Sequence, residues 1–149
     1  MGLDNMPRVL PCAYEHGVDI DDSPHGEHCN NMKDQGKCPW AINMVEAGIP
    51  VYGMLGLDCW YRGKSGNWML SKLQSKGYRP PLDFYGNDDD GISAEDCLKL
   101  SEWMLQHVEA YAYAISLDAE DNETLIEEYR YAINWLKFVA PYGGSDVWY

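Results

Sequence analysis

The chain of 149 residues lacks a long apolar run. No stretch approaches the roughly 20 consecutive apolar residues that a membrane-spanning helix needs. The first residues, 1–7, also lack the basic and then apolar pattern of a secretory signal. We therefore expect a cytoplasmic protein that has no membrane partner.

Basic residues are scarce, because 11 Lys and Arg stand against 24 Asp and Glu, for a net charge of −13. A field of this sign repels phosphate backbones, so direct general binding to nucleic acids is disfavoured. It favours solubility and attraction to a partner with a basic surface. The alternative interpretation is an ordinary solvated acidic surface.

Phenylalanine is also rare, with 2 residues against 11 Tyr and 6 Trp. Tyr and Trp carry a polar group, so they suit wet rims, grooves and interfaces better than dry cores. The hydrophobic content of 46% is ordinary for a globular protein. The length fits one domain, 1–149, with an irregular Cys/His-rich segment at 1–38 and a helical body at 39–149.

The five cysteines include no Cys-x-x-Cys pair, and an odd number in a reducing compartment argues against a disulfide framework. Segment 1–38 has few aliphatic side chains, and zinc binding by thiolates and imidazoles would supply the folding energy that these side chains do not. The alternative is a set of ordinary reduced cysteines. The favoured structural zinc ligands are Cys12, Cys29 and Cys38 with one histidine, His28 or His25, and Cys59 is a substitute fourth ligand.

Helical periodicity begins at Pro39, which suits a first helical position, and continues to Gly48. Segment 49–55 is predicted to be a short strand or an extended loop. A helix is predicted at about 67–76, with Gly77 as its stop. Its predicted inward side chains are Trp68, Met69 and Leu73.

Ser93 can cap the next helix, with Asp96 three residues later as in a capping box. The apolar spacing from Cys97 to Ile115 predicts one helix of about 23 residues. A break at 118–122 and a second helix that Pro141 ends complete the pattern. The predicted fold is a compact, mainly α domain with a C-terminal antiparallel helix hairpin and little β structure.

Segment 58–67 is predicted as a polar, aromatic and locally basic loop that runs into a helix N-terminus. Glycines let backbone N–H groups approach an anion, and a helix start adds partial positive charge. The segment is not a Walker A loop, because no upstream glycine precedes Gly63-Lys64-Ser65 at the required spacing. The alternative is a glycine turn whose aromatics pack on the core. The predicted ligand-binding residues are Trp60, Tyr61, Arg62, Lys64 and Asn67.

No nucleophile motif is present: neither Gly-x-Ser-x-Gly nor His-Glu-x-x-His occurs. His107 falls near the apolar stripe of the long predicted helix, where a hydrogen-bonded structural role is expected. We therefore expect a non-catalytic protein. The alternative is a small zinc-dependent hydrolase or nucleotide-modifying enzyme with its metal near Cys59.

Several short motifs resemble a loose group of small uncharacterised proteins from tailed viruses of bacteria and archaea. The resemblance implies a viral accessory protein in the host cytoplasm, and such proteins commonly bind and block host components, including defence systems. No functional residue carries over. The motifs are Met1 to Pro7 with Pro11-Cys12, Cys38-Pro39-Trp40, Asp58 to Lys64 with Gly66-Asn67, and Gly143-Gly144 with Val147-Trp148.

The predicted function is therefore that of a binding protein which blocks or sequesters a host component. In one mechanism an acidic surface occupies the basic groove of a host protein. In the other, the aromatic and basic loop captures a small anionic nucleotide, for example a signalling molecule. Homo-oligomerisation is left open.

Overall fold

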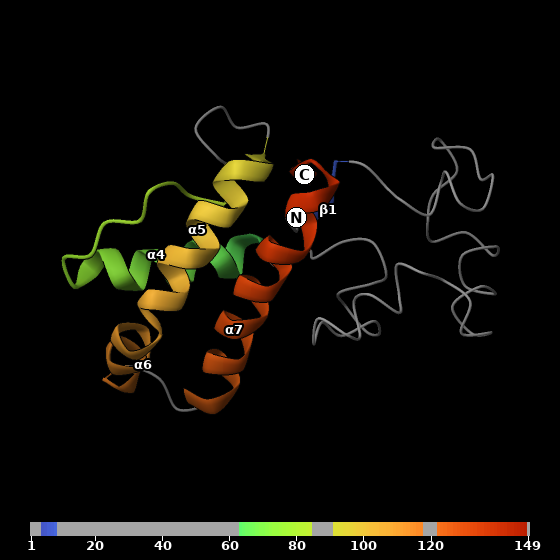
Figure 1. Ribbon diagram of the computed structural model, residues 1–149. Helices are drawn as coiled ribbons and strands as arrows, with labels where there is room; N and C mark the ends of the chain where they lie inside the picture. Colours follow the sequence, from blue (N-terminus) through green and yellow to red (C-terminus); the bar gives the residue numbers. More distant parts are fainter. Residues whose placement is uncertain (1–3, 9–62, 85–90, 118–121, 149) are drawn as a thin grey trace, which may run out of the picture.

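The computed structural model describes residues 4–8, 63–84, 91–117 and 122–148 (Figure 1). Helices dominate this part of the chain, which confirms the prediction of a mainly α domain. No helix among the described residues is long and apolar enough to cross a membrane. The elements are β1 (Asp4–Pro7), α4 (Gly63–Ser75), β2 (Ile92–Ser93), α5 (Ala94–Gln106), α6 (Val108–Ser116), α7 (Asn122–Val139), the 3-10 helix η2 (Ala140–Tyr142) and β3 (Gly144–Trp148).

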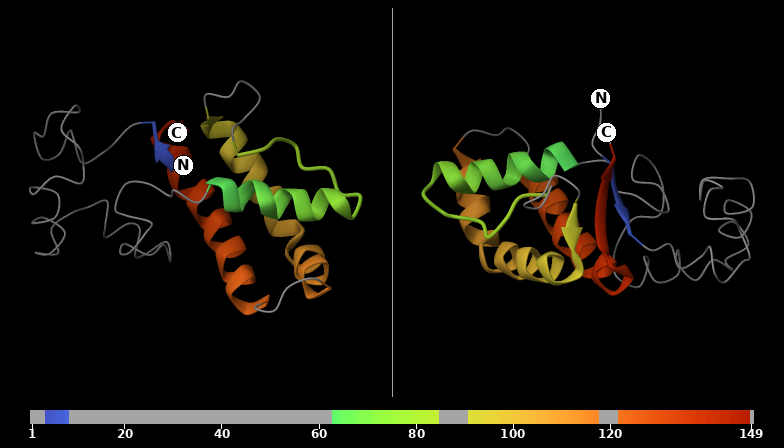
Figure 2. Two further views of the ribbon diagram at one scale, coloured as in Figure 1. Left: turned by 180° about the vertical axis from the view of Figure 1, so that it is seen from behind. Right: turned by 90° about the horizontal axis from the view of Figure 1, so that it is seen from above.

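Helices α5 and α7 lie side by side and run in opposite directions, as the predicted hairpin requires (Figure 1). Helix α4 crosses this pair on one side, where it contacts α6 and α7 (Figure 2). The helical body therefore has α4 as an outer layer.

A small antiparallel sheet joins the two ends of the chain in the order β1-β3-β2. Asp4 lies opposite Trp148 in the β1–β3 pair, and Ile92 lies opposite Ser145 in the β2–β3 pair. Strand β2 leads directly into α5, so the sheet ties the N-terminal end of α5 to the C-terminal segment.

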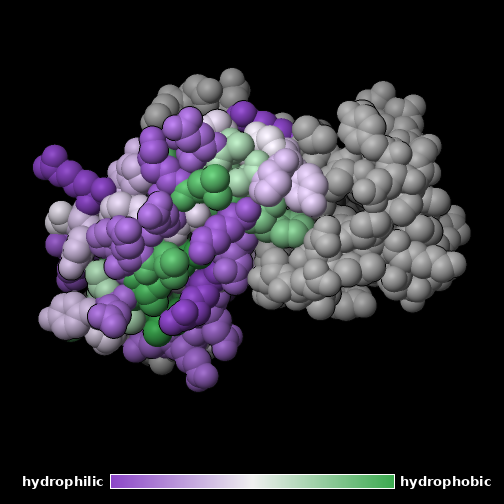
Figure 3. All heavy atoms as spheres, viewed as in Figure 1, coloured by the Kyte–Doolittle hydropathy of each residue, from purple (hydrophilic) through white to green (hydrophobic). Residues whose placement is uncertain are grey.

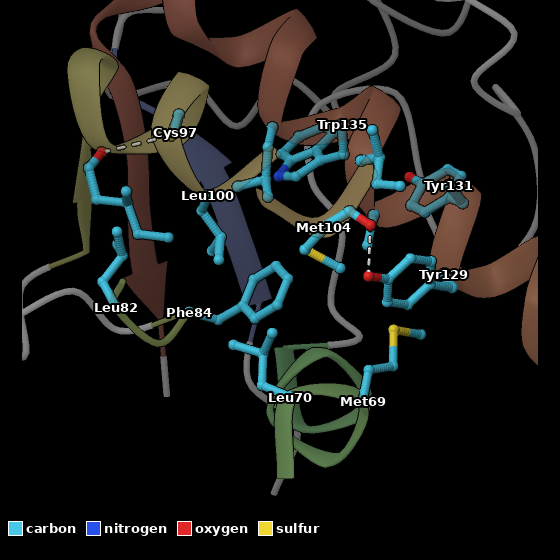
Figure 4. Close-up of a cluster of buried hydrophobic side chains, with 14 of the residues drawn as sticks. Met69, Leu70, Leu82, Phe84, Cys97, Leu100, Met104, Tyr129, Tyr131 and Trp135 are labelled. Atoms are coloured by element: carbon cyan, nitrogen blue, oxygen red, sulfur yellow. Dashed lines mark hydrogen bonds between the residues drawn. The ribbon is translucent and has the colours of Figure 1, made fainter. Parts of the chain in front are cut away.

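The core fills the space between α4, α5 and α7 with aliphatic, methionine and aromatic side chains (Figure 4). Tyr111, Tyr129 and Trp135 are fully buried there. The expectation that Tyr and Trp side chains suit rims better than cores is therefore wrong for these three. Other members of the cluster are Met69, Leu70, Leu73, Phe84, Cys97, Leu100, Met104 and Leu136.

Three predicted helix limits are confirmed. The Ser93 hydroxyl accepts the Asp96 N–H at 3.2 Å, so Ser93 caps α5. Helix α7 ends at Val139, and Pro141 lies in the short 3-10 helix that follows. Gly77, at φ +92°, follows the end of α4, and the Gly77 and Tyr78 N–H groups donate to the Gln74 and Leu73 carbonyls. This is the Schellman arrangement of a helix C-terminus.

The predicted 23-residue helix is wrong, because the chain breaks at His107 into α5 and α6. The His107 Nδ1 atom lies 2.7 Å from the Trp103 carbonyl, which the backbone N–H of His107 would otherwise bond in a continuous helix. That N–H instead donates to Met104 O at 3.1 Å. The side chain thus displaces its own backbone from the helical partner and ends α5.

Candidate functional site

Most of the predicted site residues lie outside the part of the chain that the structure describes. These are the zinc ligands Cys12, His28, Cys29 and Cys38, and the loop residues Trp60, Tyr61 and Arg62. Within the described ranges, no group of three or more His, Cys, Asp or Glu residues could hold a metal ion. Structural zinc therefore stays a prediction from the sequence.

Lys64 and Asn67 lie in α4 and not in a loop, which corrects the predicted limits of segment 58–67. Asn67 is half-buried, and its Oδ1 accepts the Phe84 N–H at 3.2 Å. The Phe84 ring covers Gly66 so closely that a Cβ at Gly66 would lie 2.7 Å from it. Asn67 thus holds the 82–84 segment against α4, and its side-chain oxygen serves the fold.

Trp68 points outward with 41% of its surface exposed, whereas the sequence analysis placed it inward. The inward positions of α4 are Gly66, Met69, Leu70 and Leu73. At 100° per residue these four positions cluster on one side of the helix, and Trp68 falls on the opposite side. Met69 and Leu73 are buried as predicted.

A row of basic side chains continues from Trp68 along the outer face of α4. The Lys72 ammonium lies 5.1 Å from the centre of the Trp68 ring, a cation–π contact. Lys76 follows four residues later and is exposed, and Lys64 occupies the position four residues before Trp68. Residues four apart are neighbours on a helix surface, so positions 64, 68 and 72 form one line on α4, and Lys76 directly follows the last residue of the helix.

Tyr78, which is 40% exposed, and the exposed Arg79 come directly after the turn that ends α4. The Tyr78 ring meets the His107 ring edge-on with centroids 5.2 Å apart, and His107 stacks on Trp103 at 4.1 Å. We call Trp68, Lys72, Lys76, Tyr78 and Arg79 the basic–aromatic surface.

His107 has the structural role that the sequence predicted. A carbonyl oxygen only accepts hydrogen bonds, so the bond to Trp103 O places a proton on His107 Nδ1. The neutral ring then has its lone pair on Nε2. The hydrogen bond and the two ring contacts orient His107 behind Tyr78 and thereby support this end of the surface.

The charge of the chain is unevenly distributed around this surface. Residues 59–82 contain five basic residues and no acidic residue, whereas the other 125 residues carry a net charge of −18. The described residues as a whole contain ten acidic and eight basic side chains, a net charge of −2. Most of the negative charge therefore belongs to other segments, and α4 is locally positive.

A second exposed feature is apolar. Leu98 and Leu105, seven residues apart on α5, are each about half exposed. Figure 3 shows apolar side chains over the α5 side of the molecule between rows of hydrophilic ones.

The predicted basic and aromatic segment, 58–67, did not include the surface residues Lys72, Lys76, Tyr78 and Arg79. One signal was available: Lys64, Trp68, Lys72 and Lys76 recur at intervals of four. That spacing places positions 64, 68 and 72 along one side of the helix once it is known to begin at Gly63, and Lys76 follows its last residue.

The basic–aromatic surface has the chemistry to hold an anion that carries a planar ring. Ammonium and guanidinium groups pair with phosphate, and exposed aromatic rings stack on bases. Comparison of the chain with protein-family models, curated proteins and solved structures gives no match.

Proposed function

We propose that this chain is a non-catalytic binding protein that captures a nucleotide-like anion on its basic–aromatic surface and so sequesters it from a host cell. One observation carries the proposal: Trp68 is exposed beside the Lys72 ammonium, in a segment that contains no acidic residue. A large exposed ring next to a cation matches a base joined to a phosphate.

The distribution of charge favours this mechanism over an acidic surface that occupies a basic groove. An acidic mimic needs a surface of high negative charge, and the described residues, with a net charge of −2, do not supply one among themselves. The virus-encoded blocking role that the sequence resemblance implies is compatible with capture of a nucleotide and remains part of the proposal.

The test is a calorimetric titration of the protein with mononucleotides and dinucleotides at low salt. We expect heat of binding that disappears in Trp68→Ala, because this change removes the stacking ring. The matched control is Tyr113→Ala, which removes an aromatic side chain that is 67% exposed on α6 and does not belong to the basic–aromatic surface. Absence of heat with every nucleotide, or equal heat in Trp68→Ala, would contradict the proposal.

A further inference from the structure

We infer that the ligand of the basic–aromatic surface is a short single-stranded nucleic acid that lies along α4. This inference rests on the proposed function and names its ligand class. The supporting facts are the order of the cations and rings along α4 and the turn after it, the two separate exposed rings and the local charge.

The cations and rings of the surface follow one another along the chain from the outer face of α4 into the turn after it. Trp68 and Ser75, the last residue of α4, are seven residues apart, about 10 Å along the helix axis. Lys72 lies between them, and Lys76, Tyr78 and Arg79 follow in and after the turn at Gly77. The outer face of a helix is convex, so it offers contacts in sequence and does not enclose one small molecule.

A free nucleotide has one base and one phosphate group or chain, so it can stack on only one of the two exposed rings. A single strand repeats base and phosphate along its length. It can therefore stack one base on Trp68 and another on Tyr78 while its phosphates meet Lys72, Lys76 and Arg79. The surface is matched to a repeating ligand.

Unpaired bases are required, because a duplex hides the faces of its bases within its own stack. At physiological salt the Debye length is about 8 Å, so charges farther than this from a short strand on α4 are largely screened. Local positive charge then governs binding.

The experiment measures fluorescence anisotropy of a labelled ten-residue oligothymidylate with the full chain. Three phosphate contacts predict a slope of about −2 for log K against log salt, so affinity falls by about 16-fold between 50 and 200 mM salt. Lys76→Gln should reduce the slope by about 0.7. Lys137→Gln, at an exposed lysine of α7, is the matched control and should leave the slope unchanged.

Loss of base stacking in Trp68→Ala should weaken binding by about 5- to 150-fold, whereas Tyr113→Ala should bind like the unchanged protein. A duplex of the same length and a mononucleotide competitor should each bind at least about tenfold more weakly than the oligonucleotide.

The outcomes separate the two proposals. If the mononucleotide competes as well as the oligonucleotide and Trp68→Ala weakens both, the present inference fails and the proposed function stands. If neither binds, both fail. If sedimentation shows self-association that Lys76→Gln abolishes, the surface binds an acidic segment of a second copy, and the inference is overturned. Duplex binding as tight as single-strand binding also overturns it.

Discussion

Two stacked tyrosines in the core differ in one hydrogen bond. The Tyr111 and Tyr129 rings lie parallel with centroids 4.3 Å apart, and both side chains are fully buried. The Tyr129 hydroxyl donates to the Met104 carbonyl at 2.6 Å. The Tyr111 hydroxyl has no hydrogen-bond partner among the described residues. One buried tyrosine hydroxyl, that of Tyr129, therefore has a hydrogen-bond acceptor, and the other, that of Tyr111, has none among the described residues.

We expect Tyr129→Phe to lower the free energy of unfolding by about 1 kcal/mol, because it removes one buried hydrogen bond. The loss is moderate because the Met104 carbonyl still accepts the His107 N–H at 3.1 Å. Urea unfolding followed by circular dichroism at 222 nm measures the difference.

Tyr111→Phe is the matched comparison, since it removes a buried hydroxyl that has no described partner. The free energy of unfolding should stay within about 0.5 kcal/mol of the original value or rise, because burial of an unpaired polar group opposes folding. Equal losses in the two variants would contradict the assignment of the hydrogen bond to Tyr129 alone.

Among the elements, the turn that follows α4 and the first residue of β3 depend on glycine in different ways. Gly77 and Gly144 both have positive φ, +92° and +97°. A Cβ at Gly77 would meet nothing within 4 Å, whereas a Cβ at Gly144 would overlap the Ile92 carbonyl oxygen. Gly144 pairs with Ser93 in the β2–β3 register, so its lack of a side chain lets the two strands approach.

Gly77→Ala should therefore cost only the backbone strain of a positive φ, about 1–2 kcal/mol. Gly144→Ala should cost more, about 4 kcal/mol, because backbone atoms of β2 must move in addition. Thermal or urea unfolding of both variants provides the comparison. Similar losses of unfolding free energy in the two variants would show that the close approach of β2 and β3 adds no cost to a side chain at position 144.

The helix limits set by local residues could be predicted from the sequence, because Ser93, Gly77 and Pro141 act through local backbone chemistry. The break at His107 could not. Apolar residues keep their spacing of three and four through the break, so periodicity does not detect it. It depends on one side chain that takes the Trp103 carbonyl from its own backbone.

Trp68 was predicted to point inward, because the size and hydrophobicity of its side chain favour burial. Its direction depends on where α4 begins and on Phe84, a residue distant in sequence that packs over Gly66. None of the predicted ligand-binding residues belongs to the basic–aromatic surface, whose members lie later in the chain, at 68–79, and were recognised from the helix limits and side-chain exposure in the structure.

At the scale of the whole molecule, negative charge and the described fold are largely separate. The described residues carry −2 of the total charge of −13. The stability of this part therefore depends less on repulsion among its surface carboxylates than the composition suggests. Its dependence on pH at the alkaline end should instead come from three buried acidic protons.

Burial raises the pKa of the Cys97 thiol from 9.0 to about 12, and burial raises the pKa values of the Tyr111 and Tyr129 hydroxyls above the ordinary 10.0. The unfolded chain loses these protons near pH 9 and pH 10, while the folded chain keeps them. Above pH 9 the unfolded state thus binds fewer protons, and stability falls as pH rises.

We expect the free energy of unfolding to fall by about 1.4 kcal/mol per pH unit between pH 9 and 10, where the Cys97 thiol is the main contributor. Above pH 10 the two tyrosines add to this slope until each folded group loses its own proton. Urea unfolding at half-unit steps from pH 8 to 11 measures it. The double variant Tyr111→Phe with Tyr129→Phe should keep the Cys97 slope and lose the steeper part above pH 10. A flat profile across this range would mean that these three groups are not buried as protonated acids in the folded protein.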